Sequence, residues 1–214
     1  SKAKCAVLHN YVKPQLSETE GCLNITGMKH PIITQLNNDI SFDPYCVNFT
    51  ESHNGMLLYG VNGSGKSTYS KSIALNVVMA QSGHYACATS MIYKPYERLY
   101  TRLGDNDNIY KGQSSFFVEM GELKSILYYA NSKSLIIGDE PCRGTEDNSA
   151  LSIVSFTLEW LLEKASTFVF ATHLHMLTEI SSIKQHPKLM IKHVSVDYNS
   201  ENVLIYTHKI IKLQ

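Results

Sequence analysis

This sequence lacks a surplus of either charge. Nineteen Lys and Arg residues balance nineteen Asp and Glu residues over 214 residues, which gives no general attraction to nucleic acid or to a membrane surface. No apolar stretch approaches the roughly eighteen residues of a membrane span, and no charged-then-apolar leader opens the chain. We therefore expect no membrane partner, and any contact with nucleic acid must be local or lie outside this sequence.

Cysteine is scarce and shows no pairing pattern. The five cysteines are odd in number and scattered, and none forms a C-x-x-C pair. This usage is typical of a reducing, intracellular compartment and not of a disulfide framework. Low-complexity segments and internal repeats are also missing. With 43% hydrophobic residues the chain can bury a core without disulfides or metal, so we predict one domain over residues 1–214. The first residue is not Met, which suggests a piece of a longer protein.

Apolar periodicity predicts an α/β fold. The expected strands are 23–26, 45–50, 56–59, 135–138 and 167–172, and the expected helices are 66–81, 115–131 and 148–164. A hairpin closes the chain, with strands at 189–198 and 203–210. Strands that alternate with helices, flanked by antiparallel strands at both ends, indicate a mixed central sheet covered by helices. The segment 87–111 is left as a long loop, and loops of that length are frequently functional.

GQSSFFVEMGEL, residues 112–123, changes from a polar loop into a run with helical apolar spacing. We predict that Phe116, Phe117 and Met120 anchor this helix to its own domain. Ser115 is a suitable N-cap for it, with Glu119 as an acidic residue near the first turn.

A phosphate-binding loop is predicted at GVNGSGKST, between an expected strand and an expected helix. Its glycines let backbone N–H groups turn inward around phosphate oxygens at the start of the helix. Lys66 would reach the β- and γ-phosphates, and the Ser67 hydroxyl would ligate Mg²⁺. The alternative, a glycine turn with a solvated lysine, is disfavoured by the flanking elements. The predicted nucleotide-binding residues are Gly60, Val61, Asn62, Gly63, Ser64, Gly65, Lys66, Ser67 and Thr68.

An acidic pair follows the buried strand SLIIGDE. Asp139 would hold the metal ion, and Glu140 would orient or deprotonate a water that attacks the γ-phosphate. Alone, such a pair is most often a polar strand end, but the phosphate loop favours a catalytic role. A glutamate beside the metal ligand favours water as the acceptor. The sequence has only three arginines, none adjacent, whereas a nucleotide kinase would need clustered ones.

His173 follows the strand 167–172, and a parallel sheet would bring it beside Glu140 at the carboxyl edge. There it could sense the γ-phosphate or hold the water, although a simple polar strand end is an equally open reading. His175 forms an H-x-H pair with it, but we predict no metal site because no third ligand is near.

Four separated blocks resemble the ATPase domain of MutS proteins, the DNA mismatch-repair family within the ABC-type ATPases. They are GVNGSGKSTYSKSIALNVVMAQSGHYACA, FFVEM, IIGDEPCRGTE and FATHLHMLTEI, and the resemblance extends from Asn10 to Ile210. GDEPCRGTE followed by SALSIV is most similar to the subclass of large DNA viruses and octocoral mitochondria. The sequence departs from the family pattern at loop residues 61, 63 and 64, at residues 141–142, and at Gln113, where many members have Arg.

The resemblance implies a P-loop NTPase of the ABC-ATPase type that binds ATP and Mg²⁺ between two copies of the domain. Ser114 of the signature segment would touch the γ-phosphate held by the second subunit, and residues 143–145 would cross the dimer. Gln81 would match the Q-loop, Asn62 would lie near the γ-phosphate, and His193 would pack on the adenine. His173 would be the switch histidine.

The resemblance also implies DNA contacts, mainly through regions outside this chain. Mismatch-reading and lever regions are expected before residue 1, and a dimerisation tail is expected after residue 214. The compartment would be the cytoplasm for a viral protein, and otherwise the nucleus or a mitochondrion. A fragment of this kind should hydrolyse ATP poorly by itself.

Three other classes of protein share parts of this pattern. A transporter subunit would carry an L-S-G-G-Q segment, which is missing. A chromosome-maintenance ATPase would have a long coiled coil between the two halves, but only seventy-three positions separate Lys66 from Asp139. A nucleotide-gated dimerisation module with decayed hydrolysis is disfavoured by the intact Lys66, Ser67, Asp139, Glu140 and His173.

Overall fold

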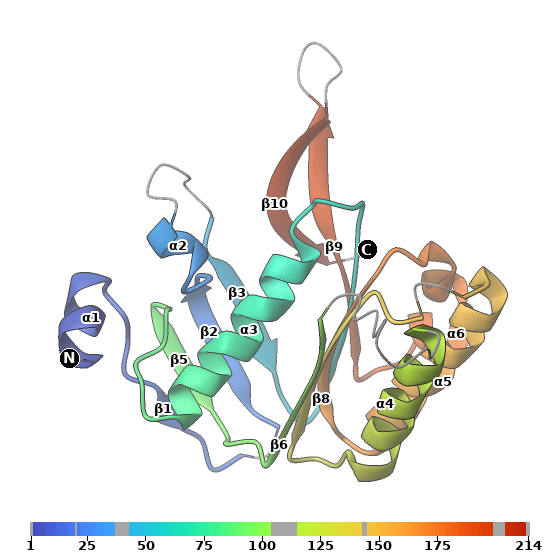
Figure 1. Cartoon of the computed structure of the whole chain (residues 1–214), viewed down its shortest axis with the longest axis horizontal. Coiled ribbons are helices and arrows are strands. Elements are labelled where there is room, and N and C mark those ends of the chain that lie inside the picture. Colours follow the sequence, from blue (N-terminus) through green and yellow to red (C-terminus); the bar gives the residue numbers. More distant parts are fainter. Residues whose placement is uncertain are drawn as a thin grey trace.

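The computed structural model describes residues 2–19, 21–36, 43–103, 115–142, 145–198 and 204–212. Its helices are α1 (Lys2–Leu8), α2 (Ile33–Leu36), α3 (Lys66–Gln81), α4 (Ser115–Tyr129), α5 (Asp147–Glu163), the 3-10 helix η2 (His175–Glu179) and α6 (Ser181–Lys184). The strands are β1 (Gln15–Leu16), β2 (Leu23–Met28), β3 (Tyr45–Phe49), β4 (Gly55–Tyr59), β5 (Ser90–Tyr93), β6 (Arg98–Leu103), β7 (Ser134–Asp139), β8 (Thr167–Thr172), β9 (Leu189–Tyr198) and β10 (Leu204–Lys212). Figure 1 shows their arrangement.

The central sheet among the described residues has the strand order β10-β9-β4-β8-β7-β6. All neighbouring pairs from β9 to β6 are parallel, and β10 pairs with β9 in antiparallel orientation. Strand β8 therefore lies between β4, which leads into the phosphate loop, and β7, which ends at the acidic pair. The predicted α/β class with a mixed central sheet is confirmed.

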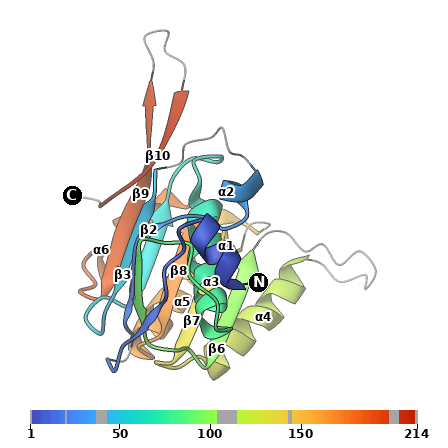
Figure 2. The same ribbon diagram turned by 90° about the vertical axis from the view of Figure 1, so that its left-hand side faces the viewer.

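Antiparallel strands are present near the N-terminus, as predicted: β2 pairs with β3 and with β5 in antiparallel orientation. With β1 they form a separate four-stranded sheet in the order β1-β5-β2-β3. Figure 1 labels all four strands, and Figure 2 shows β2 and β3 from another side. The segment 87–111, expected to be a loop, contains β5 and β6. Strand β5 has only four residues, and β6 carries two arginines in RLYTRL at the edge of the central sheet, so neither gives a clear apolar signal.

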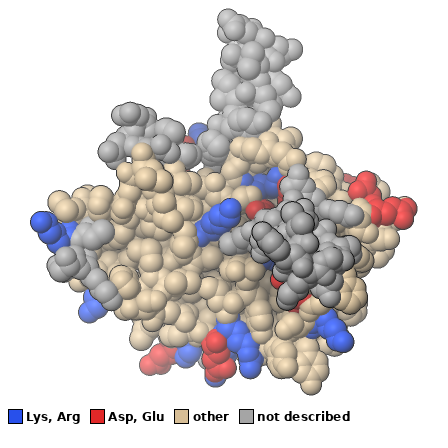
Figure 3. Space-filling model, viewed as in Figure 1, with Lys and Arg blue, Asp and Glu red and all other residues tan. Residues whose placement is uncertain are grey.

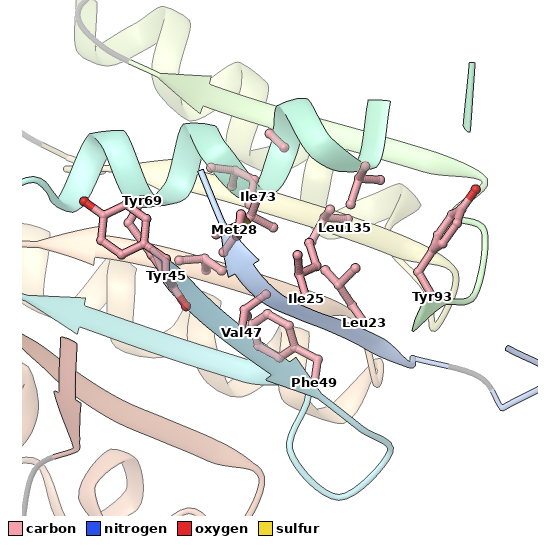
Figure 4. Packing of buried hydrophobic residues seen from close by; sticks show 14 of the residues in the cluster. Leu23, Ile25, Met28, Tyr45, Val47, Phe49, Tyr69, Ile73, Tyr93 and Leu135 are labelled. Atoms are coloured by element: carbon pink, nitrogen blue, oxygen red, sulfur yellow. The ribbon is translucent and has the colours of Figure 1, made fainter. Parts of the chain in front are cut away.

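Helix α3 packs between the two sheets. Tyr69, Ile73 and Val77 of α3 are fully or almost fully buried in a cluster that includes residues of β2, β3, β4 and β7 (Figure 4). Helix α5 lies on the other face of the central sheet, where Val154, Leu158 and Leu161 join a second cluster. The buried residues of α5 recur at helical spacing, which explains why this helix could be predicted from the sequence.

Helix α4 differs from its predicted packing in two respects. Ile126 is buried and Met120 packs partly against the second cluster, but the Phe117 side chain is 66% exposed, so the prediction that Phe117 anchors the helix is wrong. Glu119 does not support the helix start either, because its Oε1 accepts a hydrogen bond from the Cys142 amide at 2.7 Å. The Ser115 side chain lies outside the described residues.

The Asn76 side chain links α3 to the segments that follow β2 and precede β5. Its Oδ1 accepts the Cys87 N–H at 2.7 Å, and its Nδ2 donates to the carbonyls of Ser72 at 2.9 Å and Lys29 at 3.2 Å. The side chain is fully buried. Helix α3 is thereby fixed to the residue after β2 and to the segment before β5.

Asn76→Ala is expected to lower the free energy of unfolding by about 2–4 kcal/mol, because a buried N–H and carbonyls lose their partners. Urea unfolding followed by the fluorescence of Trp160, the one tryptophan of the sequence, measures the change. Ser82→Ala at the exposed end of the same helix removes a solvent-accessible bond to Val78 and should change little. Equal losses in both variants would contradict the role of Asn76.

No helix in the described part of the chain is both long and apolar enough to cross a membrane. On the face drawn in Figure 3, the charged residues that the structure describes are scattered, and both signs occur near one another at the lower edge.

Candidate nucleotide-binding site

The loop between β4 and α3 has the backbone of a phosphate cradle. Gly63 and Gly65 have φ values of 80° and 105°, which L side chains rarely adopt, and Gly65 is the N-cap residue of α3. A Cβ on Gly60 would lie 3.2 Å from the Ser64 Oγ, so this turn also leaves little space for a side chain. The chain enters α3 with its first amide groups available to an anion, as a helix start allows.

Lys66 lies inside this loop. Its Nζ donates to the carbonyl of Gly60 at 2.6 Å and to that of Val61 at 3.2 Å, and it lies 3.7 Å from the Glu140 Oε1. The side chain is only 4% exposed. Burial lowers the Lys66 pKa, although the nearby carboxylates of Glu140 and Asp139 oppose this shift. The ammonium group is thus held at the loop by carbonyls and by the acidic strand end.

The acidic pair ends β7, two strands away from the loop in the central sheet. Among the described residues, the Asp139 Oδ1 is buried without a hydrogen-bond partner, as an oxygen awaiting a cation would be. No three His, Cys, Asp or Glu side chains gather as a metal site in this part of the chain. Mg²⁺ fits such a site, because it is usually bound by one or two carboxylates together with phosphates and water.

The backbone after Asp139 turns sharply. Glu140 and Cys142 have φ values of 51° and 63°, a conformation that costs a non-glycine residue about 1–2 kcal/mol. The Glu140 amide donates to the carbonyl of Ala171 in β8 at 2.8 Å. This turn directs the Glu140 side chain toward Lys66, where it is 14% exposed.

His173 lies where the parallel sheet is expected to bring it. It follows β8, and its Nδ1 is 3.9 Å from the Glu140 Oε1. Its side chain is 45% exposed, so it can meet a ligand at this edge. Lys66 and His173 thus both lie within 4.0 Å of the same Glu140 oxygen, where the segments that follow β4, β7 and β8 meet.

The remaining predicted residues of the phosphate loop differ in their exposure to solvent. Val61, Asn62 and Gly63 are exposed, whereas Ser67 and Thr68 are partly buried at the start of α3. Ser114 lies outside the described residues, and so do Gln113 and residues 143–144 of the predicted dimer-crossing loop.

The structure does not bring Gln81 to this site. Gln81 is the last residue of α3, about 22 Å along the helix from Lys66. Its side chain pairs with the backbone of Tyr96, as Nε2 donates to the Tyr96 carbonyl at 3.0 Å and Oε1 accepts the Tyr96 amide at 2.9 Å. This contact gives Gln81 a structural role, and its predicted contact with the nucleotide stays a prediction.

His193 lies on β9, opposite Tyr59 in the register with β4. The two ring centroids are 5.6 Å apart with the planes tilted by 34°, and His175 meets the same Tyr59 ring edge-on. The His193 Nδ1 is buried and has no hydrogen-bond partner among the described residues. His193 is close to the start of the loop, but its predicted contact with the adenine stays a prediction.

The sequence reasoning missed the part played by Glu119. This glutamate of α4 accepts the Cys142 amide and lies 3.8 Å from the Arg102 Nε. Its side chain is 12% exposed. The available signal was an acidic residue next to Met120 on a helix whose other inward positions are apolar.

Comparison with known proteins agrees with this geometry. The family MutS domain V matches residues 56–214. Over 98% of its length the chain is 39% identical to the mitochondrial DNA mismatch repair protein mutS homolog of Sarcophyton glaucum, of which it covers 21%. It is 43% identical over 74% of its length to a putative DNA mismatch repair protein mutS homolog of Acanthamoeba polyphaga mimivirus, covering 14% of that protein.

A bacterial relative, the DNA mismatch repair protein MutS of Alkaliphilus oremlandii, is 38% identical over 99% of the chain. The chain spans 24% of that protein, so it corresponds to about a quarter or less of these relatives. The domain match covers most of the chain and includes the loop, the acidic pair and His173. The chain therefore belongs to the MutS family and carries its domain V.

Proposed function

We propose that this chain binds ATP with Mg²⁺ and hydrolyses it, as the ATPase domain of a MutS-type DNA mismatch repair protein. The observation that carries the proposal is the convergence of Lys66, Glu140 and His173 beside the phosphate loop. Lys66 and the loop amides would hold the phosphates, and Ser67 and Asp139 would ligate Mg²⁺. Bound Mg²⁺ would neutralise charge on the β- and γ-phosphate oxygens.

The role of Glu140 in this proposal is to orient the attacking water and accept its proton. Its 14% exposure leaves it reachable from the site, and the turn after Asp139 fixes its direction. His173, at 3.9 Å from the same carboxylate, would hold the water or contact the γ-phosphate from the neighbouring strand. Hydrolysis fits these groups better than phosphoryl transfer, because the acceptor they can activate is water.

The whole protein would contact DNA mainly through regions outside this chain. The names of its relatives as DNA mismatch repair proteins and the zero net charge of the chain support this view. The ATPase rate of the full-length protein, measured with Mg²⁺ and with matched and mismatched duplexes, tests it. Turnover that no DNA alters would contradict a mismatch-repair motor, and binding without turnover would point to a nucleotide-gated dimerisation module.

A second copy of the domain would complete the ATP site in this proposal. Ser114→Ala is then expected to spare ATP binding by the monomer and to weaken ATP-dependent pairing, because one hydroxyl contact with the partner's γ-phosphate is lost. Sedimentation velocity with and without ATP measures the pairing. Thr157→Ser, on a buried face of α5, is a control that leaves a hydroxyl in place. Equal sedimentation of the wild type and Ser114→Ala with ATP would contradict the proposed partner contact.

A further inference from the structure

Two backbone hydrogen bonds from different elements hold residues 139–142. The Glu140 amide donates to Ala171 of β8 at 2.8 Å, and the Cys142 amide donates to the Glu119 Oε1 of α4 at 2.7 Å. Both amides belong to residues with positive φ. Such backbone persists only where the surroundings fix it. Glu119 therefore restrains the backbone of the segment that carries Glu140, in addition to the contacts of the Glu140 side chain with Lys66 and His173.

Glu119 is itself oriented by Arg102 of β6. The Arg102 Nε lies 3.8 Å from the Glu119 Oε1, and its Nη1 binds the Glu122 Oε2 at 2.6 Å. The side chains of Arg102 and Glu119 are 15% and 12% exposed, so water competes little for this pair. One carboxylate thus joins α4, β6 and the segment after β7.

We propose that Glu119 is a positioning residue for ATP hydrolysis, which fixes the Cys142 amide and through it the direction of the Glu140 carboxylate. This inference rests on the proposed function. Glu119 holds the amide of Cys142, which follows Glu140 by two residues, so it acts on Glu140 through the backbone. Because α4 carries Glu119, a shift of α4 against the central sheet would be passed to Glu140. Catalysis is sensitive to displacements of about 1 Å at the reacting groups.

Four variants of the full-length protein test the inference. Glu119→Ala removes the acceptor, and Glu119→Asp keeps the charge but withdraws the oxygen by one methylene. Glu119→Gln keeps an acceptor oxygen at nearly the same place without the charge. Glu122→Ala is the matched control, because Glu122 binds the same arginine and accepts no amide of the segment 139–142 in the contacts of the described residues.

Single-turnover hydrolysis at saturating MgATP should slow by about ten- to a hundredfold in Glu119→Ala and Glu119→Asp. Glu119→Gln should stay within about threefold of the wild type, because its amide oxygen still accepts the Cys142 amide. Glu122→Ala should do the same, because Glu122 is 49% exposed and exposed ion pairs contribute little. The dissociation constant for ATP should change less than about twofold in all four, since none of these side chains binds phosphate. Comparing Glu119→Asp with Glu119→Gln decides the question even where Glu119→Ala does not fold.

Hydrogen exchange of the Cys142 amide gives a readout that needs no ATP. It should accelerate in Glu119→Ala and Glu119→Asp and stay slow in Glu119→Gln and Glu122→Ala. Unchanged exchange in Glu119→Asp, or a wild-type hydrolysis rate in that variant, overturns the inference, as does a Glu119→Gln protein that is equally slow. If the wild type itself does not hydrolyse ATP, the proposed function fails, and exchange still decides whether Glu119 holds the segment.

Discussion

Replacing Glu140 with glutamine is expected to slow ATP hydrolysis by about a hundredfold or more while ATP still binds. Glutamine keeps the size and shape of the side chain, but its amide cannot accept a proton from water. The phosphate loop and Lys66 stay unchanged, and one negative charge near the phosphates is removed. ATP affinity should therefore be equal to that of the wild type or somewhat higher.

Single-turnover hydrolysis and equilibrium ATP binding by the full-length protein separate these two effects. Glu146→Gln is the matched control, since Glu146 is an exposed residue at the start of α5, in the same connection that follows β7. That control should hydrolyse ATP at the wild-type rate. An unchanged single-turnover rate in Glu140→Gln would assign proton transfer to another group and leave Glu140 as a partner of Lys66.

The convergence at the sheet edge could be predicted because it depends on strand order alone. Residues 135–138 and 167–172 are apolar runs bounded by polar residues, and both proved to be central parallel strands. The carboxyl ends of parallel strands share one edge, so Glu140 and His173 had to be neighbours once β7 and β8 paired. Lys66 followed from the motif at the end of β4.

The features that sequence missed depend on contacts between distant segments. The Glu119 contact joins α4 to a turn 23 positions away, and nothing in FFVEM indicates which amide it meets. Gln81 was assigned by position in a motif, whereas the backbone of Tyr96 lies close enough to take both of its polar atoms. Phe117 has the right spacing for burial, but its side chain is 66% exposed.

Strand β6 also could not be predicted from the sequence, because its place in the sheet depends on pairing with a distant strand. Its arginines would argue against a central strand, and its position at the sheet edge makes them acceptable. Arg102 then supplies the ion pairs that orient Glu119. Strand β6, which was predicted to be a loop, thus supports Glu119, the residue that we propose to position the Glu140 carboxylate.

Lys66→Met is expected to weaken ATP binding by about a hundredfold or more with only a modest loss of fold stability. The ammonium group would otherwise make charge-assisted bonds to phosphate oxygens, each worth about 1.5–3 kcal/mol, and a tenfold change in affinity corresponds to about 1.4 kcal/mol. In the folded chain its charge is already buried, with a lowered pKa, against two carbonyls and Glu140. Removing one partner of a buried ion pair is destabilising because the other charge is left unpaired, but Glu140 is 14% exposed, so water can solvate part of its carboxylate.

The affinity for ATP should therefore change much more in Lys66→Met than the unfolding temperature. Isothermal titration with MgATP should show the loss of affinity, while the unfolding temperature falls only modestly. Lys71→Met, on the same helix and outside the loop, should change neither quantity much. A wild-type affinity would remove Lys66 from the phosphate site. A large fall in the unfolding temperature would instead mean that the bonds from Nζ to Gly60 and Val61 hold the loop, so that lost binding reflects a collapsed cradle and not a missing charge.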